Sequence, residues 1–326
     1  MTRTQVLEKA VALCDERPIQ AVAAALHQDH PELFRSRDNA RSALRKRLGA
    51  QGEASRRGKS DPKLSTIAEG IAKIRREPPE EDAEITIGAG VTAILSDVHI
   101  PHHDAKALTL ATEHAKAKGA TDIILNGDML DSYGISRFTR EVGRLTYQQE
   151  LYELRAFLEL VRDEFPDARI VYKLGNHEER LRAYILNGCK ELADLEALKL
   201  ENLLGLDELG IETVRFNPIK VGKLNVLHGH ELQHGFIAPV NPARGVYMRT
   251  KANTLVGHHH QVSHHSESSL DGDQVGCWSV GCLCDLRPEY NRYGFLRWRH
   301  GFAIVEVEED GNFHVNNHSI LNGRVM

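Results

Sequence analysis

The sequence is poor in cysteine and contains no long apolar segment. Its 326 residues include five cysteines, an odd and sparse set for this length, which indicates reduced thiols rather than a disulfide framework. No run of about eighteen apolar residues occurs, so we expect no membrane span. The N-terminal residues MTRTQVLEKA also lack the apolar core of a signal peptide. These absences predict a cytoplasmic protein.

Three of the cysteines, Cys277, Cys282 and Cys284, lie close together in the sequence. The simplest interpretation is a set of reduced, partly buried thiols. A small structural metal site that combines them with His264 or His265 stays open, although the spacing does not match a standard zinc site. The sequence leaves the role of these thiols undecided.

Histidine, in contrast, is abundant and unevenly placed. Many of the eighteen histidines fall in three short runs, at residues 99–103, 228–234 and 258–265. Histidine is costly to bury without a partner and is the commonest metal ligand in proteins. This clustering therefore indicates metal chemistry.

The first fifty residues differ in charge from the rest of the chain. Residues 1–63 carry thirteen Lys and Arg against eight Asp and Glu, a net charge of about +5, whereas the whole chain carries −5. Residues 1–50 have the apolar spacing of three short helices, with Pro18 separating the first two and Asp38 as the expected N-cap of the third. A basic last helix is typical of a helix-turn-helix-like module that contacts nucleic acid. Alternatively, the module is a helical cap or oligomerisation arm whose cations face solvent. The candidate contacts are Arg41, Arg45, Lys46 and Arg47.

A linker is expected over residues 51–84. Its first part is rich in Gly, Ser and charge, a helix is expected over residues 64–76, and the prolines of EPPEEDAE exclude regular structure near its end. We therefore expect a second domain over residues 85–326.

In that second domain, predicted strands and helices alternate. Five apolar strands end in polar residues, and a helix capped by Asp104 and an amphipathic helix over residues 147–165 separate the first three. A leucine-rich helical insert is expected over residues 179–210. Ligands bind at the carboxyl edge of open α/β sheets, which makes these strand ends a candidate site. In chain order the polar clusters are Asp97-x-His99, Asp128-x-x-Asp131, Asn176-His177-Glu178, His228 and His258-x-His260.

This ordered series resembles the calcineurin-like metallophosphoesterases over about residues 91–260. The resemblance implies a four-layer αββα sandwich with a dinuclear metal site at the carboxyl ends of the strands. It implies that Asp128 bridges the two metals, because a shared carboxylate offsets their repulsion. Manganese is the favoured metal, and iron or zinc are possible with oxygen and imidazole ligands. The implied ligands are Asp97, His99 and His260 for one metal, and Asn176, His228 and His258 for the other.

The resemblance also implies that a metal-bridging hydroxide attacks the phosphorus. His177 matches the family's general acid, and Asp131 matches the carboxylate that orients it, although Asp131 could instead serve as a helix cap or loop hydrogen bond. Protein Ser/Thr phosphatases of this superfamily carry Arg where this chain has Ser132. An arginine for the phosphate must then come from elsewhere. Candidates are Arg137, Arg140 and Arg180, and His230 is expected either to contact substrate or to pack.

Outside the metal motifs the chain is similar to phosphoesterases of bacteriophage and prophage genomes. The matching stretches are HPELFRSRDNARSALRKRLGAQG, GNHEERL, WSVGCLCDLRPEY and HGFAIVEV. This narrower resemblance implies a bacterial host or a phage-infected cell, and a role related to nucleic acid.

Three functional hypotheses follow. The first is a nuclease or nucleotide phosphodiesterase, the second is a phosphomonoesterase acting on a metabolite or a phosphoprotein, and the third is a DNA-binding regulator with a metal-bound, non-catalytic domain. The insert is expected to be a lid, an oligomer contact or a core-packing helical pair. The sequence does not decide between DNA, RNA and small nucleotides, between endo and exo attack, or between oligomeric states.

Overall fold

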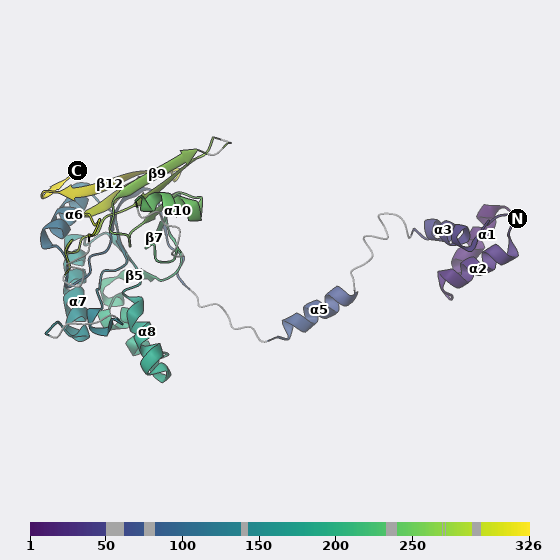
Figure 1. The fold of residues 1–326 in the computed structure, drawn as a ribbon, viewed down its shortest axis with the longest axis horizontal. Helices are drawn as coiled ribbons and strands as arrows, with labels where there is room; N and C mark the ends of the chain where they lie inside the picture. Colours follow the sequence, from purple (N-terminus) through teal and green to yellow (C-terminus); the bar gives the residue numbers. More distant parts are fainter. Residues whose placement is uncertain are drawn as a thin grey trace. The chain divides into compact units, whose positions relative to one another are not determined.

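The computed structural model describes residues 1–49, 62–74, 82–137, 143–232, 240–268, 270, 272–288 and 295–326. The contacts of the chain divide it into two units, Met1–Glu80 and Glu81–Met326, which are described separately (Figure 1). Among the described residues, no helix has the length and apolar character needed to cross a lipid bilayer.

The N-terminal unit contains three helices that share a small core. They are α1 (Arg3–Leu13), α2 (Ile19–Asp29) and α3 (Arg37–Arg47), and a further helix, α5 (Pro62–Ala72), follows. Val6, Leu26, Phe34 and Leu44 are among the side chains buried between the first three helices. Each helix is too short to be stable alone in water, so this shared apolar cluster stabilises all three.

The start of α3 corrects one sequence prediction. Its N-cap is Ser36, whose hydroxyl accepts a hydrogen bond from the backbone N–H of Asn39 at 3.1 Å. Asp38 lies within the first turn, where its negative charge favours the helix dipole. The prediction of Asp38 as the cap was wrong because serine and aspartate are both strong cap formers.

The second unit is built on two β-sheets. Within the described residues, one sheet has seven strands in the order β13-β12-β11-β2-β3-β4-β5, and the other has six in the order β1-β6-β7-β8-β10-β9. The strands are β1 (Thr86–Ile87), β2 (Gly90–Leu95), β3 (Asp122–Asn126), β4 (Arg169–Lys173), β5 (Ile211–Val214), β6 (Ile219–Val221), β7 (Leu224–Leu227), β8 (Thr254–Val256), β9 (Ser263–Ser268), β10 (Gln274–Ser279), β11 (Gly301–Val307), β12 (Phe313–Leu321) and β13 (Arg324–Val325).

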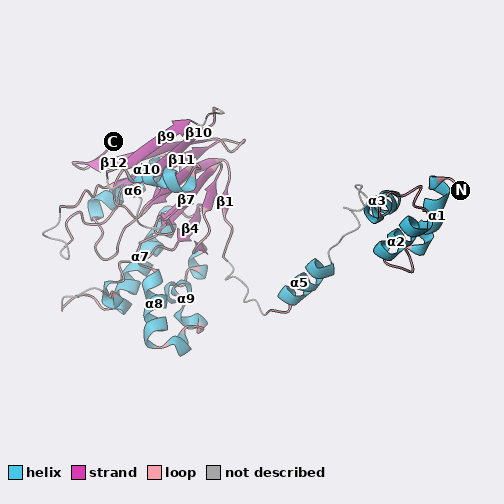
Figure 2. Cartoon of the chain, turned by 45° about the vertical axis from the view of Figure 1, so that its right-hand side comes forward, coloured by secondary structure: helices cyan, strands magenta, loops and turns pink. Residues whose placement is uncertain are grey.

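The two sheets pack face to face, and helices cover both outer faces (Figure 2). Successive side chains of a strand point to opposite faces. Ile124 of β3 therefore packs between the sheets with Val226 of β7, whereas Ile123 and Leu125 pack outward with residues of α6 (Ala105–Ala117) and α7 (Tyr147–Glu164). On the other side, α10 (Pro242–Thr250) covers β7, β8 and β10. These layers confirm the predicted four-layer αββα sandwich.

Parallel pairing brings the predicted site residues to one edge. In the seven-stranded sheet β2, β3 and β4 are parallel neighbours, and in the six-stranded sheet β7 and β8 are parallel neighbours. The carboxyl ends of parallel strands meet at one edge of a sheet. All five polar clusters therefore follow strands that end at the same side of the sandwich.

The insert after β4 has two different halves. Its elements are α8 (Glu179–Gly188), η2 (Lys190–Leu192), η3 (Glu196–Leu198), α9 (Leu200–Leu204) and η4 (Asp207–Leu209). Leu200 and Leu204 are buried in the main core, and Arg155 of α7 donates a hydrogen bond to the carbonyl of Leu204 at 2.8 Å. In contrast, α8 has no buried side chain. The second half of the insert is thus a packing element, whereas α8 packs on the core through the partly buried Leu181 and presents most of its other side chains to solvent and to the cleft described below.

Candidate metal centre

The ends of β2, β3 and β8 bring together the first predicted group of ligands. The Nε2 atom of His260 lies 3.0 Å from Oδ1 of Asp97 and 3.2 Å from Nε2 of His99. The Nε2 atom of His99 lies 3.9 Å from Oδ2 of Asp128. These atoms face one another although they come from three different strands, which is the arrangement that a shared cation requires.

The second predicted group surrounds the same Asp128 oxygen. Its Oδ2 atom lies 3.3 Å from Nε2 of His228. Ligand atoms of Asp128, His228 and His258 all lie within 4.8 Å of one another. Asn176 comes from the end of β4 and lines the adjoining cleft. One oxygen of Asp128 is therefore placed between two groups of imidazoles, as a bridging ligand would be.

Several buried polar atoms at this edge have no partner in hydrogen-bond geometry among the described residues. Three of them belong to predicted ligands: Oδ1 of Asp97, Nε2 of His228 and Oδ1 of Asn176. A buried polar atom without a partner costs about 1–3 kcal/mol. Because each atom belongs to a predicted ligand, divalent cations fit this donor set and would satisfy all three. Oxygen and imidazole donors suit manganese, iron or zinc.

Each of the two ligand carboxylates is held through its other oxygen. Oδ2 of Asp97 accepts hydrogen bonds from the backbone N–H of His258 at 2.9 Å and from the hydroxyl of Ser96 at 2.6 Å. Oδ1 of Asp128 accepts one from the backbone N–H of His177 at 2.9 Å. These contacts fix the carboxylates and leave Oδ1 of Asp97 and Oδ2 of Asp128 facing the imidazoles.

The backbone at the strand ends is strained. Several predicted ligands have a positive φ angle, a region that residues other than glycine rarely occupy: Asp97 (56°), His99 (51°), Asp128 (52°), His258 (62°) and His260 (54°). Such strain costs about 1–3 kcal/mol per residue and is typical of functional sites. Gly127 meets a related constraint, because a Cβ atom there would collide with the ring of His228. The strand ends are thus shaped for ligand placement at some expense of stability.

Glu178, which the sequence analysis did not assign a role, connects two of these loops. It is 3% exposed. Its Oε2 atom accepts hydrogen bonds from the backbone N–H groups of Asp128 at 2.9 Å and Gly175 at 2.8 Å. Its Oε1 atom accepts from the N–H of Leu130 at 3.0 Å and the hydroxyl of Tyr172 at 2.8 Å. One buried carboxylate therefore holds the loops after β3 and β4 together.

A buried ion pair supports the loop after β7. Lys173 is fully buried, and its Nζ atom lies 2.9 Å from Oε1 of Glu231. Burial raises the pKa of Glu231, but Lys173 and neighbouring groups outweigh this effect and lower it. Glu231 also accepts a hydrogen bond from the backbone N–H of Gly229 at 2.7 Å, next to His228. Sequence reasoning missed this pair, because a lysine inside a strand usually indicates a solvent-facing position.

The predicted general acid His177 lies at the mouth of the centre. Its Nδ1 atom is 2.7 Å from the carbonyl oxygen of Asp131 and 3.4 Å from the Oδ1 atom of that residue. The Asp131 carboxylate lies closer to Nδ1 of His99, at 2.9 Å. Asp131 thus contacts both rings: its carboxylate lies against His99 and, at the longer distance, against His177, which its main-chain carbonyl also contacts.

Charges inside the centre shift the pKa of several groups. Burial lowers the pKa of His228, but the Asp128 carboxylate outweighs burial and raises it to about 10. Burial and the charge of His228 lower the pKa of His258 to about 3. Burial raises the pKa of Asp131, but hydrogen bonds from His177 and His99 prevail and lower it. Because metal ligands must be unprotonated, cation binding here displaces protons.

The candidate substrate contacts are only partly brought together. Arg180 donates hydrogen bonds to the carbonyl of Asp131 and to Nε2 of His177, each at 2.8 Å. Arg137 and Arg180 line one cleft of about 640 Å³ with Asn176. The ring centroid of His230 lies 5.3 Å from that of His228, on the side of the second ligand group. Arg140 lies outside the described residues.

The basic side chains of α3 lie in the separate N-terminal unit. Arg45 and Lys46 are exposed in its last turn. Arg47 forms an ion pair with Glu8, and Arg41 forms one with Asp38 at 3.3 Å. Any anionic partner must therefore compete with internal carboxylates at Arg41 and Arg47.

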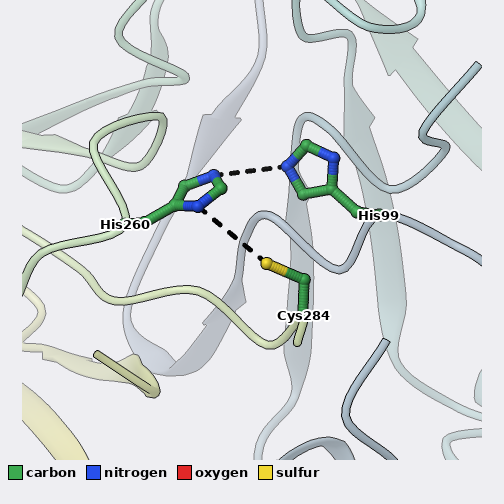
Figure 3. A group of neighbouring side chains, drawn as sticks. All are labelled: His99, His260 and Cys284. Atoms are coloured by element: carbon green, nitrogen blue, oxygen red, sulfur yellow. Dashed lines mark hydrogen bonds between the residues drawn. The ribbon is translucent and has the colours of Figure 1, made fainter. Parts of the chain in front are cut away.

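The thiols of Cys282 and Cys284 lie beside the first ligand group, where sequence reasoning did not place them. Ligand atoms of His99, His260 and Cys284 all lie within 4.8 Å of one another (Figure 3). His264 instead stacks on Trp278, and His265 lies 2.9 Å from Glu267. The alternative thiol site with His264 or His265 is therefore not the grouping that the fold produces.

Comparison with known proteins agrees with this geometry. A family model described as calcineurin-like phosphoesterase matches residues 91–283. The Gene 54 protein of Mycobacterium phage L5 is 26% identical over 229 residues, which cover 66% of this chain and 88% of the phage protein.

Two solved structures are similar to most of the chain at low sequence identity and low TM-score. Vacuolar Protein Sorting 29 from Cryptosporidium parvum is 11% identical with a TM-score of 0.40, over 73% of this chain and 95% of that protein. A dimetal phosphatase from Danio rerio is 11% identical with a TM-score of 0.33, over 71% of this chain and 96% of that protein. The family match itself spans more than half of the chain and includes all five strand ends of the metal centre. The chain therefore belongs to the calcineurin-like phosphoesterase family and is a metal-dependent phosphoesterase.

Proposed function

We propose that this phosphoesterase hydrolyses phosphodiesters of nucleic acids or nucleotides. The observation that carries the proposal is the cleft of about 640 Å³ beside the metal centre, which is lined by Asn176, Arg137, Arg180 and Tyr184. A phosphodiester has one negative charge, so it needs fewer arginines than a phosphomonoester. The cleft extends along α8 beyond the metal ligands and has room for groups on the far side of the phosphate.

The side chain of Tyr184 supports a nucleotide substrate. It lines the cleft and is 57% exposed. Exposed aromatic rings stack on nucleic acid bases, with a contribution of about 1–3 kcal/mol per base. In this proposal, Arg180 contacts the phosphate and Tyr184 contacts an adjoining base.

The proposed metal ligands are those predicted from the sequence, and manganese is the proposed metal, with iron or zinc as alternatives. When bound, the two divalent ions supply an activated water as nucleophile and neutralise negative charge on the phosphoryl group. The remaining chemistry belongs to the protein's own side chains.

We assign His177 as the general acid that protonates the leaving oxygen. Arg180 occupies its Nε2 atom by donating a hydrogen bond. A substrate phosphate that attracts Arg180 would release Nε2 for a proton. Burial and Arg180 lower the pKa of His177, whereas Asp128 and Asp131 raise it and prevail. Movement of Arg180 to the phosphate removes one lowering influence, so proton donation is coupled to substrate binding.

The test compares esters that differ only in charge. Metal-stripped protein reconstituted with manganese is assayed on bis(p-nitrophenyl) phosphate and on p-nitrophenyl phosphate, beside labelled single- and double-stranded DNA and RNA. Hydrolysis of the diester with cleavage of one polymer is the expected result. Hydrolysis of the monoester alone, with every polymer intact, would instead support a phosphomonoesterase. Retention of DNA without hydrolysis of any ester would support the regulator hypothesis.

A further inference from the structure

Each imidazole of the candidate metal centre has one nitrogen that faces the other predicted ligands and one that faces away. The partner of the nitrogen that faces away differs from ring to ring. Nδ1 of His99 contacts the Asp131 carboxylate at 2.9 Å, and Nδ1 of His228 contacts the carbonyl oxygen of Asn126 at 2.7 Å. Such oxygen acceptors fix the tautomer and the orientation of a metal-binding imidazole. Both rings therefore have the support that metal-binding histidines usually have.

His260 has a sulfur atom in the corresponding position. Its Nδ1 atom lies 3.9 Å from Sγ of Cys284, and Figure 3 shows this contact at one ring nitrogen and the contact with His99 at the other. The Nε2 atom of His260 faces Oδ1 of Asp97 at 3.0 Å. The thiol therefore contacts the ring nitrogen that does not face Asp97 and His99.

Cys284 is held in this position by the loop that carries Asp97. The backbone N–H of Leu283 donates to the carbonyl of Asp97 at 3.0 Å, and the carbonyl of Leu283 accepts from the N–H of Asp104 at 2.9 Å. Cys284 itself forms an isolated β-bridge with His103. The segment is thus part of the same rigid edge as the ligands.

Cys282 adds a second thiol to the same contact. In extended backbone, residues two apart point to the same side. Cys282 lies close enough to Cys284 and to His260 for the three side chains to interact electrostatically. The Cys282 thiol also lies 3.7 Å from the carbonyl of Arg299, whose N–H donates to the carbonyl of His260 at 2.8 Å. Both thiols are buried, so water does not replace them as partners of His260.

We propose that Cys284, supported by Cys282, is a positioning residue that orients His260 for the first metal. The thiol holds the Nδ1 edge of the imidazole and thereby directs Nε2 toward Asp97 and His99. The sulfur contact of His260, at 3.9 Å, is longer than the oxygen contacts of His99 and His228. Binding of a metal at the first position, between Asp97, His99 and His260, therefore depends on a cysteine.

The test measures cobalt binding by the full-length protein and does not depend on any substrate. Metal-stripped wild type, Cys284→Ala and Cys284→Ser are titrated with Co²⁺, and bound cobalt per chain and the visible absorption spectrum are recorded. Cys277→Ala is the matched control, because Cys277 is equally buried but lies under α10, with its thiol on the carbonyl of Ala252. Thermal unfolding of each metal-stripped protein controls for folding.

Wild type and Cys277→Ala are expected to bind two cobalt ions. In Cys284→Ala one of the two affinities should fall about 10- to 100-fold, the usual effect of removing the group behind a ligand, while the other is unchanged. Cys284→Ser keeps a hydroxyl acceptor and should recover part of the loss. Unchanged binding of both ions by Cys284→Ala would overturn the proposal, as would equal loss of both ions with a lower unfolding temperature.

The cobalt spectrum separates positioning from direct ligation. An intense sulfur-to-cobalt charge-transfer absorption in wild type that disappears in Cys284→Ala would make the sulfur itself a ligand and would overturn the positioning role. Absence of that absorption, together with selective weakening of one site, supports the role stated here. Loss of ester hydrolysis with intact cobalt binding would concern the proposed function and not this inference.

Discussion

The backbone N–H of His177 donates a hydrogen bond to Oδ1 of Asp128 at 2.9 Å. The residue proposed to protonate the leaving group therefore also fixes the carboxylate proposed to bridge the two metals. Because this contact uses the main chain, a substitution of the His177 side chain leaves it in place. The roles of the two residues can be separated by experiment for this reason.

Replacing His177 with alanine should preserve metal binding and reduce turnover. A general acid contributes about 10²- to 10⁴-fold, and the contribution is largest for leaving groups that are poor without a proton. We therefore expect a large loss of kcat on alkyl phosphodiesters and a small loss on p-nitrophenyl esters, with two metals still bound. Equal kcat for the variant and wild type on alkyl esters would contradict the general-acid assignment.

Replacing Glu178 with glutamine should weaken both the fold and the metal centre. The amide nitrogen of glutamine cannot accept a hydrogen bond, so at least one of the three backbone N–H groups that the carboxylate now binds loses its acceptor. Each buried unsatisfied donor costs about 1–3 kcal/mol. We expect the free energy of unfolding to fall by about 3 kcal/mol in a denaturant titration, together with weaker metal binding.

Tyr172→Phe is the matched comparison for Glu178, since it removes only the hydroxyl that donates to Oε1. It should reduce the free energy of unfolding by about 1 kcal/mol and leave metal affinity nearly unchanged. Equal effects of the two substitutions would show that Glu178 does not hold the loops after β3 and β4.

The sequence predicted which side chains meet at this edge better than it predicted the groups that support them. Each ligand pair follows an apolar strand within a few residues, so a local pattern identifies it. Asp97 with His99 and His258 with His260 are examples, and the parallel pairing of β2 with β3 and of β7 with β8 explains why these clusters meet.

The supporting groups could not be identified in the same way. Glu178 binds the backbone of Asp128, which is fifty residues away, and Cys284 meets His260 across twenty-four residues that include β9 and β10. Neither contact follows from periodicity or composition, because it depends on how loops from different strands fold over the edge. The role of Lys173 in β4 was missed for a related reason, because its partner Glu231 lies in the loop after β7 of the other sheet.

Stability at acidic pH should depend on Asp82, which ties the start of the second unit to the loop after β5. Its carboxylate accepts hydrogen bonds from the backbone N–H groups of Arg215 at 2.9 Å and of Phe216 and Asn217 at 2.6 Å. Burial raises the pKa of Asp82, but these hydrogen bonds prevail and lower it. The stabilisation is therefore present above the unfolded pKa of about 3.9 and is lost as pH falls through the folded pKa.

We expect Asp82→Ala to lower the free energy of unfolding by about 1–2 kcal/mol at pH 7. The difference from wild type should shrink as the pH falls below about 4. Urea titrations of both proteins between pH 3 and pH 7 measure this, with the pH values chosen around the unfolded pKa. A difference that does not change with pH would show that the ionised carboxylate is not the stabilising species.

Replacing Arg45 and Lys46 together with alanine tests the nucleic-acid role of α3. If both contact phosphates, the magnitude of the slope of log affinity against log salt concentration should fall by about 1.4 to 1.8, since each contact contributes about 0.7 to 0.9. Turnover of bis(p-nitrophenyl) phosphate should not change, because the centre lies in the other unit. Arg47→Ala is a useful comparison, as its ion pair with Glu8 should reduce its contribution. An unchanged slope in the double variant would leave the module as a structural arm.

The most direct test of a dinuclear centre bridged by Asp128 is a titration of metal-stripped protein with manganese, in which bound metal and diester hydrolysis are followed in the same samples. We expect the wild-type protein to reach full activity as it approaches two bound ions per chain. Asp128→Asn should lose tight binding of both ions and all measurable activity, because its charged oxygen faces both ligand groups. Asp122→Asn, at the opposite end of β3, is the control and should behave as wild type. Full activity with one bound ion, or two tightly bound ions in Asp128→Asn, would contradict a dinuclear centre bridged by this residue.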